Sequence, residues 1–186
     1  MVPVISLWLP IVVSAVLVFV ASSILHMLLS YHNNDFGKLK AEDEVMDALR
    51  PFDITPGDYI MPCLSGPKEM GTEAFIAKTK KGPVAFLTVL PSSPLNMGAQ
   101  LTQWFLYSIA MGAVAGYVAG LTLGPGADYR TVFRITSTVA FAGYSLALMQ
   151  GAIWYKHNWG FTLKTMLDGL VYALLTAGTF GWLWPD

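Results

Sequence analysis

The chain has 186 residues, of which 54% are hydrophobic and only 12% are charged, and its formal net charge is −1. Soluble domains carry about a quarter charged residues, so the composition excludes an ordinary water-soluble domain and predicts an integral membrane protein. Acids and bases are mixed along the chain, and no basic run indicates a nucleic-acid partner. The single cysteine, Cys63, excludes an intramolecular disulfide and a metal site built from several cysteines.

A membrane-spanning helix is predicted at residues 4–30. The segment has no Lys, Arg, Asp or Glu between Val4 and Leu29, and a hydrocarbon core about 30 Å thick needs roughly 20 apolar residues in a helix. A cleaved signal peptide would have a positively charged start and a shorter apolar stretch. We therefore interpret the segment as a span that is retained in the protein.

Residues 31–100 are predicted to form a small α+β cap on the membrane surface, because the segment is too apolar for a flexible linker. A short helix is predicted at 41–50, with its acids early and Arg50 last, as the helix dipole prefers. Pro51 follows, and helices usually end before proline. Short strands are predicted at 74–78 and 84–90, on either side of a KKGP turn.

Three further apolar segments are long enough to cross a bilayer, at 101–123, 131–153 and 163–184. The predicted fold class is therefore an all-α membrane protein of four transmembrane helices, with the cap inserted between helices 1 and 2.

Side chains near the ends of these spans predict the membrane boundaries and the orientation. Indole rings prefer the headgroup level, and long basic side chains extend to it. Lysines flank the cap side, and only Arg130 and Arg134 lie opposite, so the positive-inside rule predicts both termini outside and residues 31–100 in the cytoplasm of a bacterial cell with the protein in its inner membrane. The expected interface anchors are Trp8, Trp104, Arg134, Trp154, Trp159, Lys164, Trp182 and Trp184.

Small residues recur every four positions in three of the predicted spans. Residues four apart return nearly to the same helix face, and small side chains let helix backbones approach closely in lipid, where the hydrophobic effect no longer drives association. These stripes predict packing within one bundle or, alternatively, against another subunit. Their members are Gly112, Gly116 and Gly120; Gly143, Ala147 and Gly151; and Gly169, Ala173, Ala177 and Gly181.

Polar side chains at similar depth predict a cluster near the cytoplasmic ends of the spans. Ionisable residues inside a membrane are costly and are usually functional or paired. His26 lies on the first span and Asp168 on the last, while Gln103 and Gln150 lie at the same level on the other two. Two interpretations stay open: a hydrogen-bonded layer that fixes helix register, or a proton, ion or ligand path through His26 and Asp168.

A metal site in the stretch HMLLSYHNND is not predicted. Six residues rotate a helix by about 600°, which leaves two side chains some 120° apart. His26 and His32 are six residues apart, so a continuous helix would direct them to different faces, and only unwinding near Ser30 would bring them together. No metal or other cofactor is predicted from the sequence.

The favoured function at this point is a non-catalytic accessory or scaffold subunit that docks through helix faces and through the cap. The sequence has no phosphate-binding loop, no GxSxG nucleophile motif and no CxxCH haem motif. The first alternative is a small oligomeric transporter or channel with a polar path at His26 and Asp168. The second is a cofactor-binding membrane subunit that uses His26. The expected partners are the lipid bilayer and a protein partner or a second copy of the chain.

Overall fold

The computed structural model describes residues 1–94 and 96–186, which form two units. The first unit combines Met1–Phe36 with Asn96–Asp186, and the second is Gly37–Leu95. The first unit is helical, and the second holds a two-stranded sheet with two short helices. The described part of the chain is therefore mostly helical with a small sheet.

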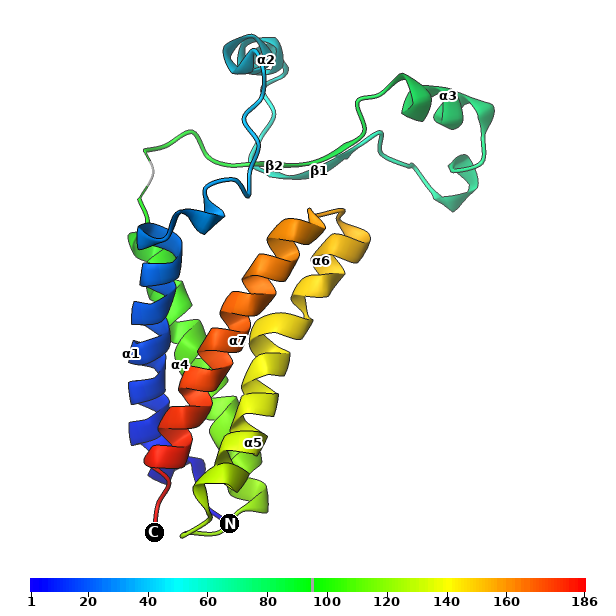
Figure 1. Ribbon diagram of the computed structural model, residues 1–186. Coiled ribbons are helices and arrows are strands. Elements are labelled where there is room, and N and C mark those ends of the chain that lie inside the picture. The colour runs from blue at the N-terminus through cyan, green and yellow to red at the C-terminus, as the bar shows by residue number, and fades with distance from the viewer. Residues whose placement is uncertain (95) are drawn as a thin grey trace. The chain divides into compact units, whose positions relative to one another are not determined.

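The helical unit is a bundle of four long rods (Figure 1). Helix α1 (Trp8–Ser23) begins after a 3-10 turn (Val4–Leu7) and continues through a π-helical turn (Ile24–Leu28). It packs against α4 (Gly98–Thr122) and α7 (Trp159–Trp182). The remaining rod consists of α5 (Tyr129–Phe141), a π-helical turn (Ala142–Leu146) and α6 (Leu148–Trp154), and it packs against α7 and α4.

Both chain ends lie at the same end of this bundle. The Val2 amide donates a hydrogen bond of 2.9 Å to the Gly120 carbonyl at the end of α4. The Gly126 amide, in the loop between α4 and α5, donates one of 2.8 Å to the Pro185 carbonyl. The opposite end of the bundle therefore holds the end of α1 and the loop between α6 and α7 (Figure 1).

Among the described residues, three helices are long and apolar enough to cross a membrane: Val4–Leu28, Gly98–Thr122 and Tyr129–Trp154. This supports a membrane location. The fourth predicted span corresponds to α7, which has 24 residues but a lower hydropathy, because it contains Asp168 and several threonines. Four crossings are therefore not established by length and composition, and α7 as a membrane span stays a prediction.

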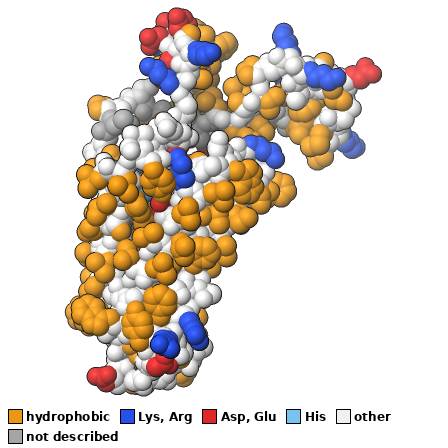
Figure 2. Space-filling model, in the orientation of Figure 1, with side chains coloured by type: hydrophobic (Ala, Val, Ile, Leu, Met, Phe, Trp, Pro, Cys, Tyr) orange, Lys and Arg blue, Asp and Glu red, His pale blue; other side chains and the backbone are white. Residues whose placement is uncertain are grey.

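The bundle exposes many of its large apolar side chains and buries much of its hydroxyl content, although large side chains such as Phe180 and Leu7 are fully buried. Hydrophobic side chains gather along the visible flank of the helices (Figure 2). Val16 on α1, Val114 on α4 and Leu167 on α7 are all exposed. The fully or nearly fully buried polar residues are Ser14, Ser22, Ser108, Thr136, Ser145, Thr162, Asp168, Thr176 and Thr179. An apolar surface of this kind is unfavourable in water and suits a lipid environment.

The glycine stripe of α4, which consists of Gly112, Gly116 and Gly120, is buried within the bundle. An added Cβ at Gly112 would lie 3.5 Å from the Ile11 Cα, and one at Gly116 would lie 2.9 Å from the Phe180 ring. At Gly120 it would collide with the Val2 carbonyl oxygen. In this structure the stripe is thus covered by the N-terminal segment, α1 and α7, so it does not present a free face to another subunit.

The other predicted stripes have mixed surroundings. Added Cβ atoms would meet the Met111 side chain at Gly143, the Tyr144 backbone at Gly169 and the Tyr129 ring at Gly181. Ala173 and Ala177 are fully buried, and the space beside Gly151 is occupied by His157. Large side chains as well as backbone atoms therefore pack against these small residues.

Ala147 departs from its predicted stripe. It is exposed, whereas Gly143 and Gly151 are half-buried. The four-residue spacing assumed a regular α-helix, but the π-helical turn Ala142–Leu146 precedes Ala147 and widens the local helical repeat. Residues 143, 147 and 151 therefore do not share one face.

Unit Gly37–Leu95 contains α2 (Glu42–Leu49), β1 (Gly57–Met61), α3 (Glu73–Lys81) and β2 (Ala85–Val89). The two strands pair antiparallel, with Gly57 opposite Val89 and Met61 opposite Ala85. Helix α2 falls within the predicted 41–50, and β2 within the predicted 84–90. None of the described residues in this unit is buried.

The strand predicted at 74–78 was wrong, because these residues lie in α3. Local capping explains the helix. The Thr72 side chain accepts a hydrogen bond from the Phe75 amide, and Glu73 lies in the first turn. Three lysines occupy the last turn, and Gly82 follows with a φ of +63°. The strand that pairs with β2 is instead β1.

Gly120→Ala is expected to destabilise the bundle by about 1–3 kcal/mol, because the added methyl group would collide with backbone that cannot rotate away. Gly178→Ala is the matched control, since its nearest neighbour would be the Tyr129 hydroxyl at 3.8 Å. Reversible unfolding of the purified protein in mixed micelles measures both. Equal stability of the two variants would contradict the close contact at Gly120.

Candidate functional site

The end of α1 is interrupted at Leu29, which has the extended backbone angles φ −90° and ψ 135°. The chain then forms a 3-10 turn at Ser30–His32. This break brings the His26 and His32 rings into a stack, with centroids 4.2 Å apart and planes 25° apart. A continuous helix from His26 to His32, which would have separated the two rings, is therefore wrong, because the chain leaves the helix at Leu29, next to Ser30.

Asp168 of α7 is the buried centre of the site, with a side chain only 2% exposed. The Tyr31 hydroxyl donates to its Oδ1. Its Oδ2 lies 2.9 Å from His32 Nε2 and 3.8 Å from His26 Nε2. A buried carboxylate is costly unless polar partners surround it. The segment from His26 to His32 supplies those partners, so the break in α1 and the carboxylate on α7 belong together.

An ion pair between Lys164 and Asp35 holds the segment that follows Leu29 against α7. Lys164, one turn before Asp168 on α7, donates to Asp35 Oδ1 at 2.8 Å and to the Tyr31 carbonyl at 2.7 Å. Asp35 Oδ2 lies within hydrogen-bonding distance of His32 Nδ1. The hydrogen bonds from Lys164 and His32 hold the pKa of Asp35 below its usual range. Asp35 is thus a carboxylate that accepts from His32.

Tyr31 completes the surroundings of Asp168. Burial raises the pKa of Tyr31, and its hydrogen bond to Asp168 raises it further. The hydroxyl therefore keeps its proton and remains a donor to the carboxylate. The Lys164 ammonium also lies 5.6 Å from the centre of the Tyr31 ring, where the face of an aromatic ring attracts a cation.

His32 lies between two carboxylates, one at each ring nitrogen. A neutral imidazole has a single N–H, and it can donate to only one of them. When Nδ1–H donates to Asp35, the lone pair of Nε2 faces Asp168 Oδ2. Two acceptors in contact at 2.9 Å repel each other unless a positive charge joins them. A proton or a metal ion would supply that charge.

The donor atoms have the composition of a metal site. His26, His32 and Asp168 each offer one ligand atom, and these atoms lie within 4.8 Å of one another. Imidazole and carboxylate ligands suit zinc, iron and related divalent ions. Metal-bound histidines usually donate their other N–H to a carboxylate, which fixes their orientation. Asp35 has this position relative to His32, and Tyr31 similarly engages the second oxygen of Asp168.

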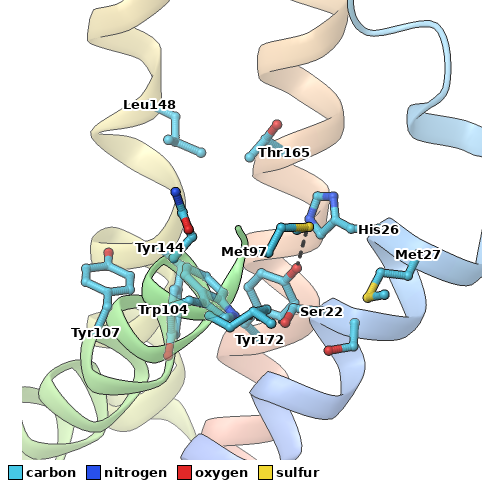
Figure 3. Close-up of a pocket in the computed structure, with 13 residues that line it drawn as sticks. Ser22, His26, Met27, Met97, Trp104, Tyr107, Tyr144, Leu148, Thr165 and Tyr172 are labelled. Carbon is cyan, nitrogen blue, oxygen red and sulfur yellow. Dashed lines mark hydrogen bonds between the residues drawn. The ribbon is translucent and has the colours of Figure 1, made fainter. Parts of the chain in front are cut away.

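A cavity of about 500 Å³ adjoins this cluster at His26 (Figure 3). Tyr172 Oη lies 3.4 Å from His26 Nε2, and both residues line the cavity. Aromatic rings form much of the wall. Trp104 lies with its centroid 5.6 Å from that of Tyr107 and 5.6 Å from that of Tyr172, and its indole N–H donates to Ser22 Oγ at 2.8 Å.

Two of the four residues predicted for a polar cluster lie in the site. His26 and Asp168 lie 3.8 Å apart at their nearest polar atoms. Gln103 and Gln150 are exposed, and the hydrogen bonds described for the cluster do not include them. Equal depth places residues at one level of a bundle, but it does not decide which way they face.

The predicted interface anchors divide into two groups. Trp8, Trp154, Trp159, Trp182 and Arg134 are exposed, as lipid-facing or headgroup-facing residues would be. Trp104 and Trp184 point inwards, and the Trp184 indole donates to the Gly124 carbonyl at 3.0 Å. Lys164 is paired with Asp35 rather than free to extend to the headgroups.

The sequence interpretation missed Tyr31 and Tyr172 as members of this site and discounted His32 and Asp35. The polar run SYHNND, directly after an uncharged span, was the signal that the helix ends before Ser30.

Comparison with protein-family models, with curated proteins and with solved structures finds no match to this chain.

Tyr31→Phe is expected to destabilise the protein by about 1–3 kcal/mol, because Asp168 Oδ1 would lose its donor while staying buried. Tyr117→Phe, at an exposed position on α4, is the matched control and should leave stability unchanged. Unfolding in mixed micelles compares the two. Unchanged stability of Tyr31→Phe would mean that the hydroxyl is not needed by Asp168.

Proposed function

We propose that this chain is a metal-binding integral membrane protein, with one divalent transition-metal ion held by His26, His32 and Asp168. The observation that supports the proposal is the convergence of two imidazoles and a buried carboxylate within 4.8 Å. The proposal develops the cofactor-binding alternative that used His26. It also accounts for the close approach of His32 Nε2 to Asp168 Oδ2 at 2.9 Å, because one metal ion could be coordinated by both atoms.

Binding requires a small rearrangement at His26. Parallel stacked imidazoles do not direct their lone pairs at one point, and the His26 and His32 planes differ by only 25°. The His26 side chain is 45% exposed, so its ring has room to turn towards Asp168, whereas His32 and Asp168 are 9% and 2% exposed. We therefore expect His32 and Asp168 to form the fixed part of the site. Three protein ligands leave a coordination position open.

The proposal includes four membrane crossings. Helix α7 would be about 36 Å long at 1.5 Å per residue, enough for the hydrocarbon core. Its low hydropathy comes partly from Asp168, Thr162, Thr176 and Thr179, which are buried in the bundle and would not contact lipid. Four crossings agree with both termini lying at one end of the bundle. By the distribution of lysines we expect the metal end to face the cytoplasm.

Metal content tests the proposal. The protein, purified in mild detergent, stripped with a chelator and then reloaded with zinc or cobalt, is expected to retain about one ion per chain after removal of free metal. His32→Ala and Asp168→Asn should each lower the affinity at least tenfold, and His157→Ala should not, because His157 lies outside the cluster. Elemental analysis measures the stoichiometry.

Two further variants separate a lost ligand from a lost fold. His26→Ala removes the most exposed ligand and should weaken binding while the protein stays monodisperse and helical. Asp35→Asn should weaken binding about 10–100-fold, the usual effect of removing a partner of a ligating histidine. Metal retention that is equal in the His32→Ala and His157→Ala variants would contradict the proposal.

An accessory role in a membrane complex is the second candidate. It is favoured by unit Gly37–Leu95, whose described residues build no buried core of their own. Exposed apolar side chains such as Phe52, Met70 and Leu90 would be covered by a partner. Isolation from native membranes should then yield a complex of fixed stoichiometry that a variant lacking residues 37–94 fails to form. An ion path is less well supported, because mostly apolar side chains line the cavity beside His26.

A further inference from the structure

We propose that the cavity beside His26 binds a long-chain carboxylate, with its chain among the aromatic side chains and its carboxylate on the open position of the metal. This inference rests on the proposed metal site and names the ligand class of that site. The link between the two is His26, which belongs both to the metal cluster and to the cavity wall (Figure 3).

The cavity has the size and lining of a site for an apolar chain. Its volume of about 500 Å³ lies within the range of small-molecule pockets, roughly 300–1,000 Å³. Apolar side chains from three segments of the bundle contribute to it, including Met27, Leu101 and Leu148. Aromatic rings from α4, the π-helical turn Ala142–Leu146 and α7 form another part of the wall, and Trp104 contacts Tyr107, Tyr144 and Tyr172.

Polar atoms in the wall are largely engaged with the protein itself. The Tyr107 hydroxyl donates to the Gly143 carbonyl at 2.9 Å, and Trp104 donates to Ser22. Ser22 and Ser23 both donate to the Phe19 carbonyl at 2.9 Å. These walls therefore present carbon to a ligand. The polar end is at His26 and Tyr172, whose nearest ring nitrogen and hydroxyl are 3.4 Å apart (Figure 3).

The net charge around the metal cluster indicates which polar headgroup the ligand would carry. Asp35, Asp168 and Lys164 together carry a net charge of −1 when both histidines are neutral, and neutral imidazole is the form that binds metal. This charge would repel a carboxylate. A divalent ion changes the local net charge to +1 and offers an open coordination position. The site should therefore bind a carboxylate only when it is loaded with metal, whereas a neutral alcohol of the same length should show little preference.

The test uses Trp104 as the reporter and brominated amphiphiles as the probes, because bromine quenches indole fluorescence on contact. Protein with one equivalent of zinc, or with chelator, is titrated in micelles with 11-bromoundecanoic acid or 11-bromoundecanol. Comparison with Trp104→Phe isolates the cavity signal from that of the other five tryptophans. We expect the acid to quench Trp104 with at least tenfold higher affinity in zinc than in chelator, and the alcohol to show less than a twofold difference.

A matched pair of variants assigns the binding to the cavity. Leu101→Phe narrows the cavity and should weaken both probes at least fivefold, while Leu106→Phe, at an exposed position on the same helix outside the cavity lining, should change neither. Equal affinities for the two variants would overturn the assignment.

The remaining outcomes separate this inference from the proposed function. If elemental analysis of the same samples finds zinc bound but the acid does not quench Trp104, the carboxylate inference fails and the metal site stands. If zinc is bound and the acid and alcohol show the same metal dependence, the headgroup assignment fails. If zinc does not bind, both proposals are overturned.

Discussion

The burial of one carboxylate, that of Asp168, is the constraint on which the functional end of this bundle depends. A side chain that is 2% exposed in an apolar surrounding needs donors or a cation, or else a proton. The segment after Leu28 supplies polar partners, because the chain leaves the helix there and places Tyr31 and His32 beside the carboxylate. Asp35 and Lys164 then fix the returned segment from its outer side.

The same constraint connects the bundle to its cavity. The break at Leu29 leaves His26 on the last turn of the first rod, within 3.8 Å of Asp168 on one side and beside Tyr172 on the other. The aromatic wall that begins at Tyr172 continues through Trp104 to Tyr107. An apolar cavity therefore lies next to His26, the most exposed residue of the cluster, which is the arrangement that an amphiphilic ligand would use.

The sequence predicted the positions of the long apolar helices better than the local breaks in their helical geometry. Uncharged stretches predicted the apolar helices, and similar depth predicted that His26 and Asp168 would meet. Regular periodicity failed at Leu29 and at the π-helical turn before Ala147, where the backbone leaves the α-helix and residue spacing no longer gives direction. The strand predicted at 74–78 failed because helix capping by Thr72 outweighed its short apolar pattern. The direction in which a side chain such as Gln103 faces could not be predicted from the sequence and follows only from the folded structure.

We propose that His26, His32 and Asp168 share one metal ion, and X-ray absorption of the zinc-loaded protein identifies the ligands of that ion. We expect a first shell at about 2.0–2.1 Å with scattering from two imidazoles and additional oxygen, and loss of one imidazole in His26→Ala. A shell of oxygen atoms alone, or an imidazole signal unchanged in that variant, would overturn the assignment.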